Sequence, residues 1–257
     1  MTQTSEETAH AWWAAPRFVL SAAAVIVLVT IGVALFVWPG NAEDPQTPAD
    51  PQPGTAAPAP APSAAALKPE DSVCGLKASG GTTLTSAPQD VSWEFVNGLF
   101  APKSADHGPG VIDPETGVRS CYSHTPEGAL LAVASMVTAG GDPQFLVDTL
   151  KQLAIDGPGK TLNLEAIQKR VDAGTTNTAP IKIEAFRVLE YGDEKATIAV
   201  VLSGDTGSEK LYYAASEIVV WQDGDWRFKI ADDGTGGPVD APISDLSGYI
   251  IWGPDNG

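Results

Sequence analysis

The feature that most constrains this chain is an uninterrupted apolar run near its amino terminus. Residues 18–38 read FVLSAAAVIVLVTIGVALFVW and contain no charged side chain over 21 positions. At the rise of an α-helix this run is ~31 Å long, which matches a hydrocarbon layer of ~30 Å. Trp12, Trp13 and Trp38 lie where indole rings favour the headgroup boundary. The run therefore predicts a single transmembrane helix that ends before Pro39.

The flanking charges predict the orientation of this helix. Arg17 adjoins its amino end, whereas Glu43, Asp44 and Asp50 follow its carboxyl end. Because cations favour the cytoplasmic side, residues 1–17 are expected in the cytoplasm and the rest of the chain outside it. The predicted location is thus the cell membrane, crossed once. A cleaved signal peptide is the alternative, although this run exceeds the 7–15 apolar residues usual there.

Residues 39–68 are predicted to be a disordered linker. They include eight prolines, at positions 39, 45, 48, 51, 53, 58, 60 and 62, among alanine, glutamine, threonine and acidic residues. Such a stretch has too few apolar side chains to offset the entropy lost on folding. We expect it to separate the membrane segment from a folded extracytoplasmic domain at residues 69–257.

The charge of the chain disfavours nucleic acid as a direct partner. Its net charge is −17, and from residue 67 onward 14 Lys and Arg face 27 Asp and Glu. An acidic surface repels phosphates and has few cations for counterion release. The expected partners are the bilayer, through residues 18–38, and other membrane or transfer-apparatus proteins, including further copies of this chain.

Two cysteines follow the membrane segment, Cys74 and Cys121. An exported domain meets an oxidising environment in which thiols pair, so we predict a disulfide between them. Two free buried thiols are the alternative. Two cysteines without a neighbouring pair of histidines do not complete a metal site, and no metal or cofactor is expected.

The periodicity of the exported part predicts an α+β domain. Helices are expected after Thr125-Pro126, after Asp142-Pro143 and from Asn163, and each ends at or before a glycine. After Pro180 the hydrophobic period changes from 3.6 to 2, with a bulge near Phe186. Four antiparallel strands are expected in this part, the first beginning at Ile181 and the others at residues 195–203, 209–222 and 225–231. Three helices would then pack on one face of a curved four-stranded antiparallel sheet.

This order of elements ends in the hairpin 221–228, with the sequence WQDGDWRF, and resembles the cone-shaped NTF2-like superfamily over residues 125–231. Among anchored proteins of that fold it looks most like the VirB8/TcpC type of conjugative-transfer component. Segments 93–110 and 122–129 are similar to an uncharacterised family of membrane-anchored proteins from Gram-positive conjugative elements. The resemblance implies the fold and a transfer-related setting, and it implies no catalytic residues.

The sequence predicts no catalytic residues. A Ser123, His124 and Asp106 arrangement can be imagined, but neighbouring residues rarely point at one another and no nucleophile-elbow motif is present. Glu217 is the one acid in the middle of a predicted strand, in phase with Tyr213. We interpret it as an outward-facing surface charge.

Aromatic side chains offer the only candidate pocket. Tyr212, Tyr213, Trp221 and Trp226 could line a cavity for a small apolar ligand, or they could fill the core. The apolar tail 240–257 either docks on the domain or binds a partner. The sequence thus favours a non-enzymatic, membrane-anchored extracytoplasmic scaffold or assembly component, and the resemblance implies a conjugative, type IV-like transfer system as its setting. The alternative is a small-ligand-binding or sensory module at the cell surface.

Overall fold

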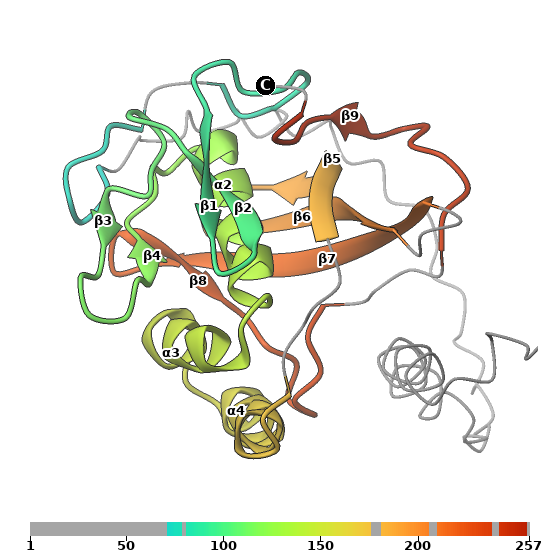
Figure 1. Cartoon of the computed structure of the whole chain (residues 1–257). Helices are drawn as coiled ribbons and strands as arrows, with labels where there is room; N and C mark the ends of the chain where they lie inside the picture. The colour runs from blue at the N-terminus through green and yellow to red at the C-terminus, as the bar shows by residue number, and fades with distance from the viewer. Residues whose placement is uncertain (1–70, 79–80, 176–180, 206–209, 238–241, 256–257) are drawn as a thin grey trace, which may run out of the picture. The chain divides into compact units, whose positions relative to one another are not determined.

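The computed structural model describes residues 71–78, 81–175, 181–205, 210–237 and 242–255 (Figure 1). In these ranges three helices accompany one five-stranded sheet and two two-stranded sheets. None of the helices in this part of the chain is long and apolar enough to span a bilayer. The predicted membrane segment 18–38 and linker 39–68 lie outside the described residues.

Helix α2 (Pro126–Ala139) is the central helix of the fold and begins at the predicted N-cap. The Thr125 hydroxyl accepts the backbone N–H of Gly128 at 3.0 Å, and Pro126 supplies the preset first residue. Almost every side chain of α2 is buried, as its nearly continuous apolar sequence predicts.

Helices α3 (Pro143–Leu153) and α4 (Pro158–Asp172) follow α2. Asp142 caps α3 by accepting two backbone N–H groups, as predicted. Helix α4 begins five residues before the predicted start, because Pro158 opens the helix instead of ending the preceding one. It packs on α3 and buries few of its side chains (Figure 1).

The main sheet is antiparallel, with strand order β8-β7-β6-β5-β9. Its strands are β5 (Ile181–Tyr191), β6 (Lys195–Asp205), β7 (Lys210–Gln222), β8 (Asp225–Phe228) and β9 (Ile250–Ile251). The register of β5 on β6 shifts between Ile183 and Ala185 and again between Val188 and Glu190, on either side of the predicted bulge. Ile198 and Val200 of β6 are fully buried in the core beneath the helices.

Two hairpins lie outside the main sheet, and we call them the N-terminal hairpins. One joins β1 (Ser92–Val96) to β2 (Leu99–Lys103), and the other joins β3 (Val111–Ile112) to β4 (Arg119–Ser120). Strand β2 packs on α2, where the Thr138 hydroxyl donates to the carbonyl oxygen of Phe100 at 3.2 Å.

The apolar tail docks back onto the domain, which was one of the two alternatives for it. Ile250 and Ile251 pair with Phe186 and Ala185 at the outer edge of β5. Trp252 is 1% exposed, and its ring lies 4.8 Å from that of Trp93 and 5.6 Å from that of Phe186. The carboxyl end of the chain therefore completes both the sheet and the core.

The expected fold, three helices on a four-stranded NTF2-like cone, is wrong. The sheet has a fifth strand, β9, the third helix packs on α3, and the N-terminal hairpins add two small sheets. Strands of two residues are too short to show a period, so β3, β4 and β9 have no signal in the sequence. Strand β2 contains Pro102, which argues against a strand in a sequence reading.

Candidate functional site

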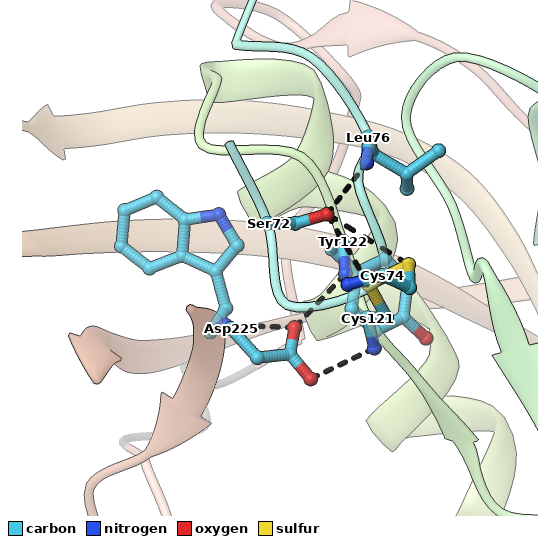
Figure 2. The surroundings of a disulfide bond; sticks show 7 residues. Ser72, Cys74, Leu76, Cys121, Tyr122 and Asp225 are labelled. Carbon is cyan, nitrogen blue, oxygen red and sulfur yellow. Dashed lines mark hydrogen bonds between the residues drawn. A yellow bond between two sulfur atoms is a disulfide. The ribbon is translucent and has the colours of Figure 1, made fainter. Parts of the chain in front are cut away.

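The structure contains the predicted disulfide between Cys74 and Cys121 (Figure 2). The Cα atoms of the two residues are 6.1 Å apart, although they are separated by 47 positions. The Ser72 hydroxyl lies 3.2 Å from the Cys121 sulfur and accepts the backbone N–H of Leu76 at 2.9 Å. The disulfide therefore fixes the start of the described chain to the segment that leads into α2.

A buried carboxylate, Asp225, holds the other side of this junction. It is 1% exposed and accepts the backbone N–H groups of Cys121, Tyr122 and Trp226 at 2.8, 2.9 and 2.9 Å (Figure 2). Burial raises the pKa of Asp225, and the three N–H donors oppose that rise. We call Cys74, Cys121, Ser72 and Asp225 the clamp.

The turn before Asp225 explains why it reaches this position. Asp223 and Gly224 both have positive φ, 55° and 73°, as a two-residue hairpin between β7 and β8 requires. Sequence reasoning found this turn but missed the role of Asp225, which it treated as the first residue of a strand. Aspartate is unusual as the first residue of a strand, and this was the only signal in the sequence that could have indicated a special role for Asp225.

His107 joins the network that caps α2. Its Nδ1 lies 3.1 Å from the Ser123 hydroxyl and 3.3 Å from the Thr125 hydroxyl. The imagined Ser123, His124 and Asp106 arrangement is thus not formed, because Ser123 meets His107. Ser123 is fully buried, so its hydroxyl is closed to a substrate and serves the helix cap.

His124 and two tryptophans form an aromatic stack beside this cap. The His124 ring lies parallel to that of Trp221, with centroids 4.0 Å apart, and its Nε2–H donates to the carbonyl oxygen of Asp193 at 2.7 Å. Trp226 is fully buried, and its indole N–H donates to the carbonyl oxygen of Ser123 at 3.0 Å. The ring centroids of the two tryptophans are 5.2 Å apart.

The four aromatic residues proposed as a pocket lining do not come together. Trp221 and Trp226 lie on the core side, but Tyr212 packs with Ile243 and Leu246 on the opposite face of the sheet. Tyr213, one position later on β7, points away from that opposite face.

The two best-formed hollows of the described structure are too small for a ligand. One, between α2 and α3, has no room for a water molecule. The other lies between β2 and β5 and measures about 10 Å³. Ligand pockets typically measure ~300–1,000 Å³, and a single water needs ~10–15 Å³. Among the residues that the structure describes, no group of three His, Cys, Asp or Glu could hold a metal.

The expectation that Glu217 faces outward is wrong. Its partner on β6 is Ile198, which is fully buried beneath the helices, so Glu217 points into the domain and not outward. The backbone N–H of Gly237 donates to its carboxylate, and burial raises the pKa of Glu217 to about 7. Glu217 lines neither of these two hollows.

The N-terminal hairpins expose large apolar side chains. Phe95 of β1 is 68% exposed, and Val111 and Ile112 of β3 are 45% and 39% exposed. Val73, next to the disulfide, is 69% exposed. Exposed apolar side chains mark a site of protein interaction where they form one patch.

Fold and site together define an acidic α+β domain with a disulfide-bonded amino-terminal segment. The sequence model of one family, Domain of unknown function (DUF8175), matches residues 46–251. The chain belongs to this family. Searches of curated proteins and of solved structures found no match.

Proposed function

We propose that this chain is a non-enzymatic assembly subunit whose extracytoplasmic domain binds protein neighbours through the N-terminal hairpins. The observation that carries the proposal is the exposure of Phe95, Val111 and Ile112 on these hairpins. Apolar and aromatic side chains at the centre of an interface supply most of its binding energy. The hairpins form sheets of their own, apart from the main sheet, and these three side chains are exposed, so a partner could cover them without altering the core.

The proposed location is the outer side of the cell membrane, with residues 18–38 as the anchor and 39–68 as the linker. A disulfide suits that side, because thiols are kept reduced in most cytosols. The likeness of segments 93–110 and 122–129 to anchored proteins of Gram-positive conjugative elements supports a conjugative, type IV-like transfer system as the setting. Its partners would be other membrane proteins of that system or further copies of the chain.

The alternative of a ligand-binding or sensory module needs a cavity. The two best-formed hollows of the described structure lack the necessary volume. For this reason we favour the assembly role.

Photo-crosslinking in intact membranes tests the proposal. A photoreactive amino acid replaces Asn97, the exposed residue at the tip of the β1–β2 hairpin, in the full-length chain. The double variant Phe95→Ser, Ile112→Ser is expected to lower the yield of one defined crosslinked product by ~10-fold or more, since central interface side chains are worth ~1–2 kcal/mol each.

The matched control is Leu162→Ser, because Leu162 is 46% exposed on α4, away from the hairpins. That variant should crosslink as the unaltered chain does. Equal yields from all three proteins, each with an unchanged melting temperature, would refute binding through the hairpins. Labelling of Lys195 on intact cells by a membrane-impermeant amine reagent tests the location separately.

A further inference from the structure

The first described residues are attached to the domain at a single place. Cys74 is bonded to Cys121, and the Ser72 hydroxyl contacts the Cys121 sulfur. The backbone N–H of Val73 donates to the carbonyl oxygen of Gly224 at 2.8 Å, in the turn between β7 and β8. Any force that reaches the domain through the preceding linker therefore enters at the clamp.

The clamp passes this force directly into the core. Cys121 and Tyr122 are held by the Asp225 carboxylate at the start of β8, and Tyr122 is 1% exposed. The next residues cap α2, and Trp226 donates to the Ser123 carbonyl. A pull on Cys74 is thus shared between the main sheet and the central helix.

Residues 75–120 lie between the two cysteines and are bypassed by this route. They contain both N-terminal hairpins, including the exposed Phe95 and Ile112. The hairpins are held by side-chain contacts and by the packing of β2 on α2. Arg119 of β4 donates to Glu94 of β1 at 2.7 Å, and Trp93 packs on Trp252. When the chain is pulled from its end, these contacts are loaded one after another, whereas the core elements share the load. The segment would therefore unfold at a lower force than the rest of the domain.

We propose that the disulfide shields the N-terminal hairpins from tension on the linker, so that a partner bound to them stays bound while the membrane tether is loaded. This inference rests on the proposed function for the partner, but the mechanical part concerns the chain alone. Without the disulfide, the same tension would run through residues 75–120 and unfold the docking surface first.

Single-molecule pulling of the full-length chain in detergent tests the inference with two loading points. In both cases one handle is attached at Lys195, an exposed residue at the start of β6 in the middle of the sheet. The second handle is attached either at Thr55, in the predicted linker, or at Asn97, at the tip of the β1–β2 hairpin. Both proteins keep the disulfide.

Loading at Asn97 is expected to give an early step of up to ~80 Å, because about 24 residues separate it from Cys121 at ~3.5 Å each. Loading at Thr55 is expected to give no such step until the whole domain unfolds, at a higher force, since the load is shared by several elements. Reducing the disulfide should add an early step of up to ~165 Å to the Thr55 trace, because the two cysteines are 47 positions apart in the sequence.

The inference is overturned if both loading points unfold the oxidised domain at the same force, or if the reduced chain shows no early step. The comparison of Thr55 with Asn97 remains decisive even if reduction unfolds the domain outright. Equal unfolding forces would refute the mechanical role of the disulfide without affecting the crosslinking at Asn97. Absence of crosslinking would refute the binding of a partner without affecting the force difference, so the two proposals can be tested separately.

Discussion

Glu217 supports a prediction in which both sign and magnitude follow from the structure. The substitution is Glu217→Gln, which keeps the size of the side chain and an oxygen that accepts the N–H of Gly237. It removes only the ionisation of a carboxyl that points into the domain beside Ile198.

Burial raises the pKa of Glu217 from 4.5 to about 7 in the folded protein. The folded state therefore binds more protons than the unfolded state between these values, and the free energy of unfolding falls as the pH rises through this window. A difference of about 2.5 units at 1.36 kcal/mol each gives a loss of about 3 kcal/mol at pH 8. The variant has no such loss, so it should be more stable than the unaltered protein by about 3 kcal/mol at pH 8 and by under ~0.5 kcal/mol at pH 4.5.

Urea denaturation of both proteins at pH 4.5, 6 and 8 measures this difference. The control is Glu165→Gln, because Glu165 is exposed on α4 and its replacement should change stability equally little at each pH. A stability gain for Glu217→Gln that does not grow with pH would refute the reasoning, and so would a loss at pH 8.

Three further predictions concern the clamp and the tail. Cys74→Ser should lower the free energy of unfolding by about 4 kcal/mol, the value for a closed loop of this length, and an unchanged urea midpoint would contradict it. Trp252→Ala should lower the free energy of unfolding by about 4 kcal/mol, because it leaves a cavity at a buried site, and it should speed amide hydrogen exchange at Ile251. The control Ile251→Ala, at a half-exposed position, should lower the free energy of unfolding by under ~1 kcal/mol. Asp225→Asn places an NH₂ group opposite the backbone N–H of Cys121, so that two donors face each other, and should lower the free energy of unfolding by about 2–3 kcal/mol. An unchanged thermal midpoint at pH 7 would count against this prediction.

Much of the fold could be predicted because its signals are local. Thr125 and Asp142 cap helices through bonds to residues two or three positions away, and proline follows each of them. The turn before β8 needs only Asp223 and Gly224 at positive φ. In each case the residues that make the structure are neighbours in the sequence, so a short window contains the whole argument.

The candidate site could be predicted only in part, because most of its contacts join distant residues. The disulfide could be predicted from the sequence, since the chain has only two cysteines. Asp225 reaches Cys121 across 104 positions, and His107 reaches Ser123 across 16, and neither contact has a pattern that a sequence reading could use. Glu217 was misread because alternation along β7 shows which residues share a face, but not which face is covered.

The fold-class error has the same origin, and the edges of the sheet show it best. An edge strand has unpaired backbone groups that a protein must pair or shield. Here β9 covers part of β5, and the residues after α3 cover β8, where Ile155 donates to the carbonyl oxygen of Phe228 at 2.9 Å. Neither of the two segments that cover these edge strands has the alternating hydrophobic pattern of a strand. Because hydrophobic period identifies a strand but not its neighbours, the sequence predicts strands β5 to β8 and misses what closes the sheet.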